Sequence, residues 1–299
     1  MAIAEDRAAP PETRRPLAES PFAKGFQRMV SSPQGAIAFA VVALLVLGAV
    51  FAPLIAPYDP IAIAPRIRFE GPSWAHLLGT DQIGRDLFSR VLYGARVALK
   101  VSLFGTTAAL SLGAMLGIIA GLGPRWIDSV LVIFCDSVRS LPMILFALAV
   151  VAIYGPSMNT LIGVIAFSMA PGYFRVVRNQ VLVLRETDFV TAANAMGASR
   201  LRVALTHLVP NLIGPLIVLI AMDIPAVIGI ESGLSFLGQG IQPPDASWGT
   251  MLSDGYSYIR KAPHIAVAAG LPVIVATVAF TFLGEALRDV FDPKSGKGR

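Results

Sequence analysis

The chain contains long stretches without Asp, Glu, Lys or Arg, and the clearest are residues 29–58, 101–124 and 140–174. About 20 helical residues cross a hydrocarbon core that is about 30 Å thick, so each stretch is long enough to span a membrane. Only 14% of the residues are charged, against about 25% in soluble domains. These features predict a protein that crosses a membrane several times.

The charge-free stretches predict an all-α membrane protein with six transmembrane helices. As one helix, residues 140–174 would be about 52 Å long, so we expect Gly155-Pro156-Ser157 to divide this stretch into spans three and four. Span three is then short, and we expect it to begin near Leu131. The other spans are expected at about 36–56, within 101–124, at 212–230 and at 265–284.

The distribution of basic residues predicts the orientation. Six spans place both termini on one side, where the flanking segments carry 16 Lys and Arg against 8 on the other side. The positive-inside rule then makes both termini cytoplasmic. Residues 1–34 are polar and rich in proline, so we expect a flexible cytoplasmic tail. The net charge of +5 is spread over loops and tails, which does not indicate nucleic-acid binding.

Three glycines recur at four-residue spacing in the second span: Gly113, Gly117 and Gly121. Such a stripe lies on one helix face and lets two membrane helices pack closely. A flexible gate is the alternative interpretation.

Three acidic residues lie at or within the predicted spans: Asp136, Asp223 and Glu231. Placing an acidic side chain inside the membrane costs free energy, so such residues usually face the interior of a helix bundle. Asp136 and Arg139 share one helix face and can form an ion pair, or they can act in gating. Asp223 and Glu231 are candidates either for a water-lined path or for structural contacts.

A charged segment between spans four and five carries a distinctive pattern of small residues. Its residues are Thr191, Ala192 and Ala193, then Gly197, and then His207, Pro210 and Asn211. Glycine is unfavourable inside a helix, so we expect Gly197 to make a turn between two short helices. We expect Ala192 and Ala193 to form a flat face that another protein can approach closely.

This segment resembles the EAA loop of ABC importer permeases, which docks into a cytoplasmic ATPase subunit. Thr191 replaces the usual Glu of that loop, so an ion pair from this position is not implied. Residues 78–96 and 234–252 resemble the second permease subunit of the dipeptide, oligopeptide and nickel importers. His207 and Asn211 fit the same subfamily.

The resemblance implies the type I ABC importer transmembrane fold in a bacterial inner membrane. It implies a first helix with a periplasmic loop over 35–96, a permease domain over 97–288 and a cytoplasmic tail over 289–299. The ATPase-coupling loop would occupy about 180–210 within the permease domain.

The implied partners are a second permease subunit, two ABC ATPase subunits and a periplasmic or lipid-anchored substrate-binding protein. The implied cargo is a di- or oligopeptide, or a related solute such as nickel. ATP and Mg would be used by the ATPase subunits, and we expect this chain to bind no cofactor. The sequence has no Gly-x4-Gly-Lys-Ser/Thr phosphate loop. Its three histidines, His76, His207 and His264, are scattered, so we expect no catalytic residue and no metal site.

Two other classes remain open at this point. A secondary transporter or channel without an ATPase would use Asp136, Asp223 and Glu231 as proton or cation sites. A scaffold subunit would only anchor an ATPase. The loop that contains residues 78–96 is either a folded cap that docks a binding protein or a loop braced against helix ends. Residues 234–252 are expected to form an external re-entrant or interfacial element.

Overall fold

The computed structural model describes residues 32–291. The parts of the two expected tails at residues 1–31 and 292–299 lie outside that range. Within the described residues the chain forms helices and loops, and no strand is present apart from one isolated bridge between Thr80 and Asp86.

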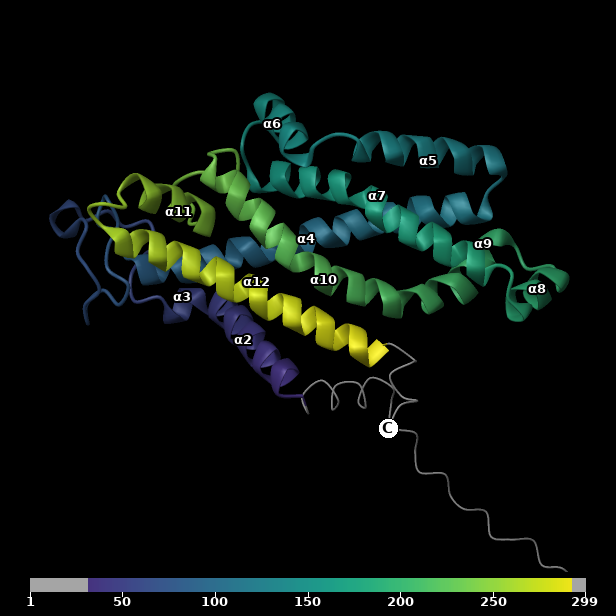
Figure 1. The fold of residues 1–299 in the computed structure, drawn as a ribbon, viewed down its shortest axis with the longest axis horizontal. Helices are drawn as coiled ribbons and strands as arrows, with labels where there is room; N and C mark the ends of the chain where they lie inside the picture. The colour runs from purple at the N-terminus through teal and green to yellow at the C-terminus, as the bar shows by residue number, and fades with distance from the viewer. Residues whose placement is uncertain (1–31, 292–299) are drawn as a thin grey trace, which may run out of the picture.

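The helices follow the order in which Figure 1 colours them. They are α2 (Pro33–Val50), α3 (Ala52–Ile55), the 3-10 helix η1 (Pro65–Ile67), α4 (Leu87–Leu122), α5 (Arg125–Arg139), α6 (Met143–Tyr154), α7 (Met158–Leu184), α8 (Asp188–Ala195), α9 (Arg200–Val203), the π-helix η2 (Ala204–Leu208), α10 (Val209–Phe236), α11 (Trp248–Ser257) and α12 (Pro263–Phe291).

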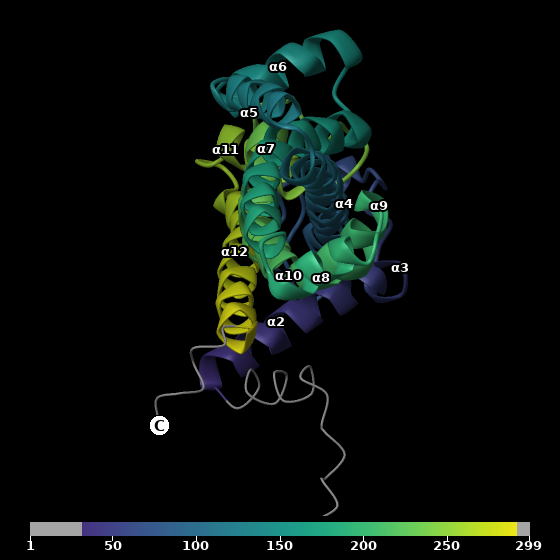
Figure 2. The same ribbon diagram turned by 90° about the vertical axis from the view of Figure 1, so that its right-hand side faces the viewer.

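Five helical segments are long and apolar enough to cross a membrane, and the bent pair α5–α6 makes six if it counts as one span. The expectation of an all-α membrane protein is confirmed. The long helices α4, α7, α10 and α12 form an elongated bundle, with α2 against α12 and α4 (Figures 1 and 2).

The third span differs from the expectation of one helix that begins near Leu131. Helix α5 begins at Arg125 and ends at Arg139, and α6 follows at an angle of 87°. Pro142 lies at this break. Proline has no N–H for the helix ladder and pushes the residue before it, Leu141, away from helical geometry. The break therefore follows from Pro142, which the sequence-based division overlooked.

The second span also differs, because helix α4 begins at Leu87 rather than near residue 101. The Asp86 carboxylate caps this helix by accepting a hydrogen bond from the Ser89 backbone N–H at 2.8 Å. The charge-free residues are only the second part of a 36-residue helix. The first part carries Arg90, Arg96 and Lys100, so hydropathy alone does not reveal it.

The glycine stripe of α4 lies against α7. A Cβ atom at Gly113 would come within 2.5 Å of the Ala170 carbonyl oxygen, and one at Gly117 within 2.9 Å of the Phe174 carbonyl oxygen. These distances are too short for real Cβ atoms. The close-packing interpretation is therefore confirmed, and it explains how α4 and α7 approach backbone to backbone.

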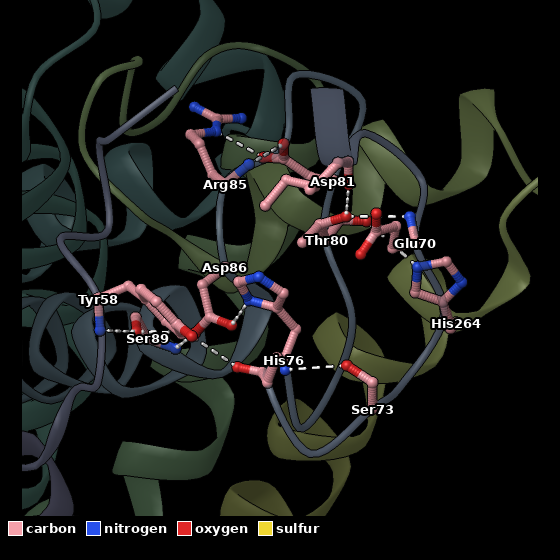
Figure 3. Close-up of polar contacts among 12 residues, drawn as sticks. Tyr58, Glu70, Ser73, His76, Thr80, Asp81, Arg85, Asp86, Ser89 and His264 are labelled. Carbon is pink, nitrogen blue, oxygen red and sulfur yellow. Dashed lines mark hydrogen bonds and ion pairs between the residues drawn. The ribbon is translucent and has the colours of Figure 1, made fainter. Parts of the chain in front are cut away.

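Residues 56–86, which we call the cap, fold over one end of the bundle (Figure 1), and Figure 3 shows their polar contacts. The His76 Nδ1 lies 2.9 Å from Asp86 Oδ1, and Tyr58 packs on the His76 ring with 4.7 Å between centroids. The Arg85 Nε donates to Asp81 Oδ2 at 2.5 Å. These buried contacts give the cap a defined structure of its own.

The cap is also fixed to the helices below it. The Arg90 Nη1 of α4 donates to the Pro60 carbonyl at 3.0 Å, and the His264 Nε2 of α12 lies 3.2 Å from the Thr80 carbonyl oxygen. Arg85 reaches Asp254 of α11 at 3.6 Å. The loop is thus braced against the helix ends, as one of the two interpretations expected. Docking of a binding protein to it stays a prediction.

The glycine contact gives a first prediction. We expect Gly117→Leu to force α4 and α7 apart and to cost about 1–3 kcal/mol, because backbone atoms of α7 occupy the space of the new side chain. Thermal stability of the purified protein measures this effect. Gly172→Ala on α7 is the matched control, since no atom lies within 4 Å of its Cβ position. Equal stability of the two variants would contradict this packing.

Candidate coupling site

The segment of residues 188–208 contains α8, α9 and η2, and we call it the α8–α9 segment. Gly197 adopts a φ of 82° between α8 and α9. The Ala198 N–H donates to the Ala193 carbonyl at 3.1 Å and the Gly197 N–H to the Asn194 carbonyl at 3.0 Å. This pair of bonds is a Schellman motif with glycine at its left-handed position. The expected turn between two short helices is confirmed.

One face of the α8–α9 segment packs against the chain itself. Its buried residues Val190, Ala193, Val203 and Leu208 contact Val177 and Val181 of α7 and Leu212 and Leu216 of α10. Ala193 is only 2% exposed. The interpretation that Ala193 belongs to a face offered to another protein is therefore wrong. Position 193 has room only for a small side chain, because α8 and α9 pack onto the ends of α7 and α10.

The opposite face of the α8–α9 segment is exposed and carries large apolar side chains among polar and charged ones. Thr191 and Ala192 are exposed on α8. Met196 at the turn is 83% exposed and Leu201 of α9 is 69% exposed, and Phe189 and Leu205 are also exposed. These four large residues were not predicted, because the pattern that indicated this segment consists of small residues. The sequence feature that could have indicated them is a large apolar side chain next to charged residues such as Asp188, Arg200 and Arg202.

The expected residues His207, Pro210 and Asn211 lie at the junction with α10. Pro210 has no N–H and leaves the Thr206 carbonyl without its α-helical donor. The chain forms the π-helix η2 there, and the Asn211 Nδ2 donates to the His207 carbonyl at 2.6 Å. The His207 ring lies 6.0 Å from the ring of Phe189. These residues shape the joint between the segment and α10.

The α8–α9 segment lies at the end of the bundle opposite the cap (Figure 1). Figure 2 views the molecule from this end, with α8 and α9 in front of α7 and α10. We call the two ends the cap end and the α8 end. The exposed apolar face is therefore far from the cap and is carried by the ends of two membrane helices.

Among the three acids, Asp136 forms an ion pair with Arg175 of α7. The expected pair of Asp136 with Arg139 is wrong. A second pair joins Asp128 to Arg178, whose Nη2 donates to Asp128 Oδ2 at 2.6 Å. The two arginines follow the charge-free stretch at i and i+3 on α7 and fix α5 along that helix.

Asp223 lies half-buried on α10. It lies near Tyr173 of α7, whose buried hydroxyl forms no hydrogen bond with the described residues. Asp223 thus lies at the junction of α7 and α10, and its role in a path stays a prediction.

Glu231 is completely buried, with 0% exposure. Its Oε1 accepts hydrogen bonds from the hydroxyls of Ser235 and Ser247, each at 2.8 Å, and its Oε2 from Ser232 at 3.3 Å. Ser247 caps α11, so this carboxyl group joins α10 to the loop before α11. These contacts favour the structural interpretation of Glu231, which stays a prediction.

Helix α10 leaves one face of small residues uncovered. Ala226, Gly229 and Gly233 are exposed at a spacing that places them on one side of the helix. A cavity of about 300 Å³ lies between these residues and Met143 and Ile144 at the start of α6. Part of this face of α10 therefore lines a cavity beside the start of α6.

Residues 113–297 match the family of the binding-protein-dependent transport system inner membrane component. This range contains the glycine stripe, the α8–α9 segment and α10. The chain belongs to this family. Residues 20–72 match the N-terminal transmembrane domain of oligopeptide transport permease C, which also confirms the subfamily resemblance.

Curated relatives share about a third of their residues with this chain over nearly its whole length. The dipeptide transport system permease protein DppC of Alkalihalophilus pseudofirmus is 37% identical over 97% of this chain and 95% of the relative. The glutathione transport system permease protein GsiD of Pectobacterium atrosepticum is 35% identical over 95% of each chain.

A chain of the MetNI methionine ABC transporter, solved in inward-facing conformations, has the same fold. It superposes with a TM-score of 0.55 at 17% identity, over 68% of this chain and 96% of the MetNI chain. The type I ABC importer transmembrane fold is thus confirmed. The protein is a permease subunit of an ABC importer and not an enzyme, and the interpretation as an importer permease is confirmed over the two alternative classes.

The contacts of Glu231 give a second prediction. We expect Glu231→Leu to destabilise the protein, because it leaves the buried hydroxyls of Ser235 and Ser247 without an acceptor at about 1–3 kcal/mol each. Glu231→Gln keeps one carbonyl acceptor and should be milder. The yield and thermal stability of the assembled complex measure both. Transport loss in Glu231→Gln at full stability would contradict the structural role and indicate a path residue.

Proposed function

We propose that the exposed face of the α8–α9 segment is the surface through which ATPase subunits drive this permease. The observation that carries the proposal is an apolar face formed by Ala192, Met196 and Leu201 on a segment whose other face is packed into α7 and α10. Apolar side chains on a polar end of a membrane protein have no lipid to cover them, so a protein partner is the matching occupant.

The contacts of the segment provide the mechanical connection. Val190 and Ala193 pack on Val177 and Val181 of α7, while Leu208 packs beside Leu212 of α10. A displacement of the segment therefore moves the ends of two membrane helices together. ATP binding to a pair of ATPase subunits would pull the segment and shift the helices between inward-open and outward-open states. Alternation requires that nucleotide and the loaded binding protein favour different states.

The complete importer on this proposal contains a second permease subunit, two ATPase subunits that use ATP and Mg, and a substrate-binding protein. The small-residue face of α10 would line the translocation path toward the second permease, since Ala226, Gly229 and Gly233 are uncovered in this chain. The cap would face the binding protein. We keep the division into a region over 35–96 and a permease domain over 97–288 as part of this proposal.

The cargo we propose is a short peptide or a peptide-like solute. The support is the similarity to relatives named for dipeptide and glutathione transport. In this assignment the α8 end and both termini face the cytoplasm of a bacterium, because ATPase subunits can reach the segment only there. The basic residues of the chain agree with this orientation.

The third prediction tests the exposed face. We expect Ala192→Arg and Met196→Arg to insert normally but to bind the ATPase subunits roughly 5- to 150-fold more weakly, since a large charged side chain overpacks a close interface. Co-purification of the complex and ATPase activity with loaded binding protein measure this loss. Thr191→Ala should have little effect, because threonine already replaces the family's Glu there.

For the co-purification measurement, the matched control is Ala75→Arg, which adds the same side chain at an exposed position of the cap. Ala193→Arg should behave differently again and lower the stability of the permease itself, since Ala193 is buried. Full ATPase association and full stimulated hydrolysis in both Ala192→Arg and Met196→Arg would refute the coupling assignment.

A further inference from the structure

A cavity of about 400 Å³ lies between α2, α4, α10 and α12, away from both the α8–α9 segment and the uncovered face of α10. Its walls are almost entirely apolar, and two basic side chains, Arg96 and Lys100, complete its lining. The apolar residues that bear on the argument are Val46, Val50, Leu103, Phe104, Ile224 and Phe280. Leu103 and Phe104 are more than half exposed, so the cavity opens on the lipid-facing surface.

The charge-free part of α4 indicates the depth of the two basic residues in the membrane. The charge-free part of α4 after Lys100 runs to Leu122 and is about 33 Å long, which matches a hydrocarbon core of about 30 Å. Arg96 and Lys100 then lie at the cap-side end of the charge-free part of α4, where we expect lipid headgroups. Val50, the last residue of α2, lines the same cavity.

The charge at the cavity is positive and is not neutralised by a neighbouring acid. Neither Arg96 nor Lys100 forms an ion pair with an Asp or Glu of residues 32–291. Arg96 lies half-buried with its guanidinium 5.5 Å from the centre of the Tyr93 ring, while Lys100 is exposed. A ring face holds a cation in place without cancelling its charge.

We propose that this cavity binds one anionic glycerophospholipid of the leaflet on the cap side. Its phosphate would be held by Arg96 and Lys100, and an acyl chain would lie between α2 and α4 against Ile224 and Phe280. Guanidinium and ammonium groups together recognise a phosphodiester, and basic pockets between membrane helices bind lipid headgroups. Bound there, the lipid fills the space between α2 and the rest of the bundle.

The fourth prediction uses the importer complex, purified with a mixture of phosphatidylglycerol and phosphatidylethanolamine and measured by native mass spectrometry. We expect the wild type to retain phosphatidylglycerol selectively. Arg96→Gln with Lys100→Gln should lower that retention by about tenfold or more, because both phosphate ligands are lost. The matched control is Arg66→Gln with Arg68→Gln, which removes two exposed basic side chains of the cap outside the cavity.

A second variant changes the apolar part without changing charge. Leu103→Trp should fill the cavity and lower retention, whereas Leu271→Trp, at an exposed position of α12 outside the cavity, should not. Lipid binding in this cavity does not depend on ATPase binding to the α8–α9 segment. Failure of the lipid proposal therefore leaves the proposed function intact.

Three results would overturn the lipid assignment. The first is equal retention of phosphatidylglycerol in the Arg96 and Lys100 variant, or equal retention of phosphatidylethanolamine in the wild type. The second is displacement of the lipid by soluble sn-glycerol 1-phosphate, which would make this a site for a free phosphate. The third is a cross-link from Leu103→Cys to the second permease, which would make the cavity a subunit interface.

Discussion

The backbone contact between α4 and α7 is the constraint on which the rest of the structure depends. Lipid is as apolar as the helices, so close packing between small residues supplies much of the attraction between membrane helices. Gly113 and Gly117 allow α4 to approach the carbonyl groups of Ala170 and Phe174. Arg185 then reinforces this contact at the α8 end by donating to the Gly121 carbonyl at 3.0 Å.

This contact also places the moving parts of the proposed mechanism. Helix α7 holds α5 through Arg175 and Arg178, and its last turns support the inner face of the α8–α9 segment. The same segment continues through η2 into α10, whose uncovered face is a candidate wall of the translocation path. A force applied at Ala192 and Met196 therefore reaches α7 and α10 through packed side chains rather than through a loop.

Much of this arrangement is predictable from the sequence because it depends on local chemistry. The charge-free stretches located the membrane helices, the glycine spacing predicted close packing, and Gly197 predicted the turn that ends α8. Other features depend on contacts between distant residues. From the sequence, Ala193 is predicted to be an interface residue, but in the structure it is buried in one cluster with Val181 and Val203. Asp136 is predicted to pair with Arg139, but α7 places Arg175 beside it.

The wrongly predicted helix bounds have specific physical causes. Hydropathy located only the charge-free part of α4, because its first turns carry Arg90, which bonds to the cap, and Arg96. The bend between α5 and α6 lies at Pro142, shortly after Arg139 and Ser140 and at the start of a charge-free stretch that predicts continuous helix up to Gly155. A search for proline within each predicted span would have located it.

Cysteine cross-linking between the α8–α9 segment and an ATPase subunit tests the central claim most directly. Cys135 is the only cysteine of the chain and is buried, so Cys135→Ala provides the background for single cysteines. We expect Met196→Cys and Ala192→Cys to cross-link to the ATPase subunit, with a yield that changes when ATP is bound. Ala193→Cys, which faces α7 and α10, should not react. Cross-linking at Ala193→Cys with none at Met196→Cys or Ala192→Cys would contradict the account.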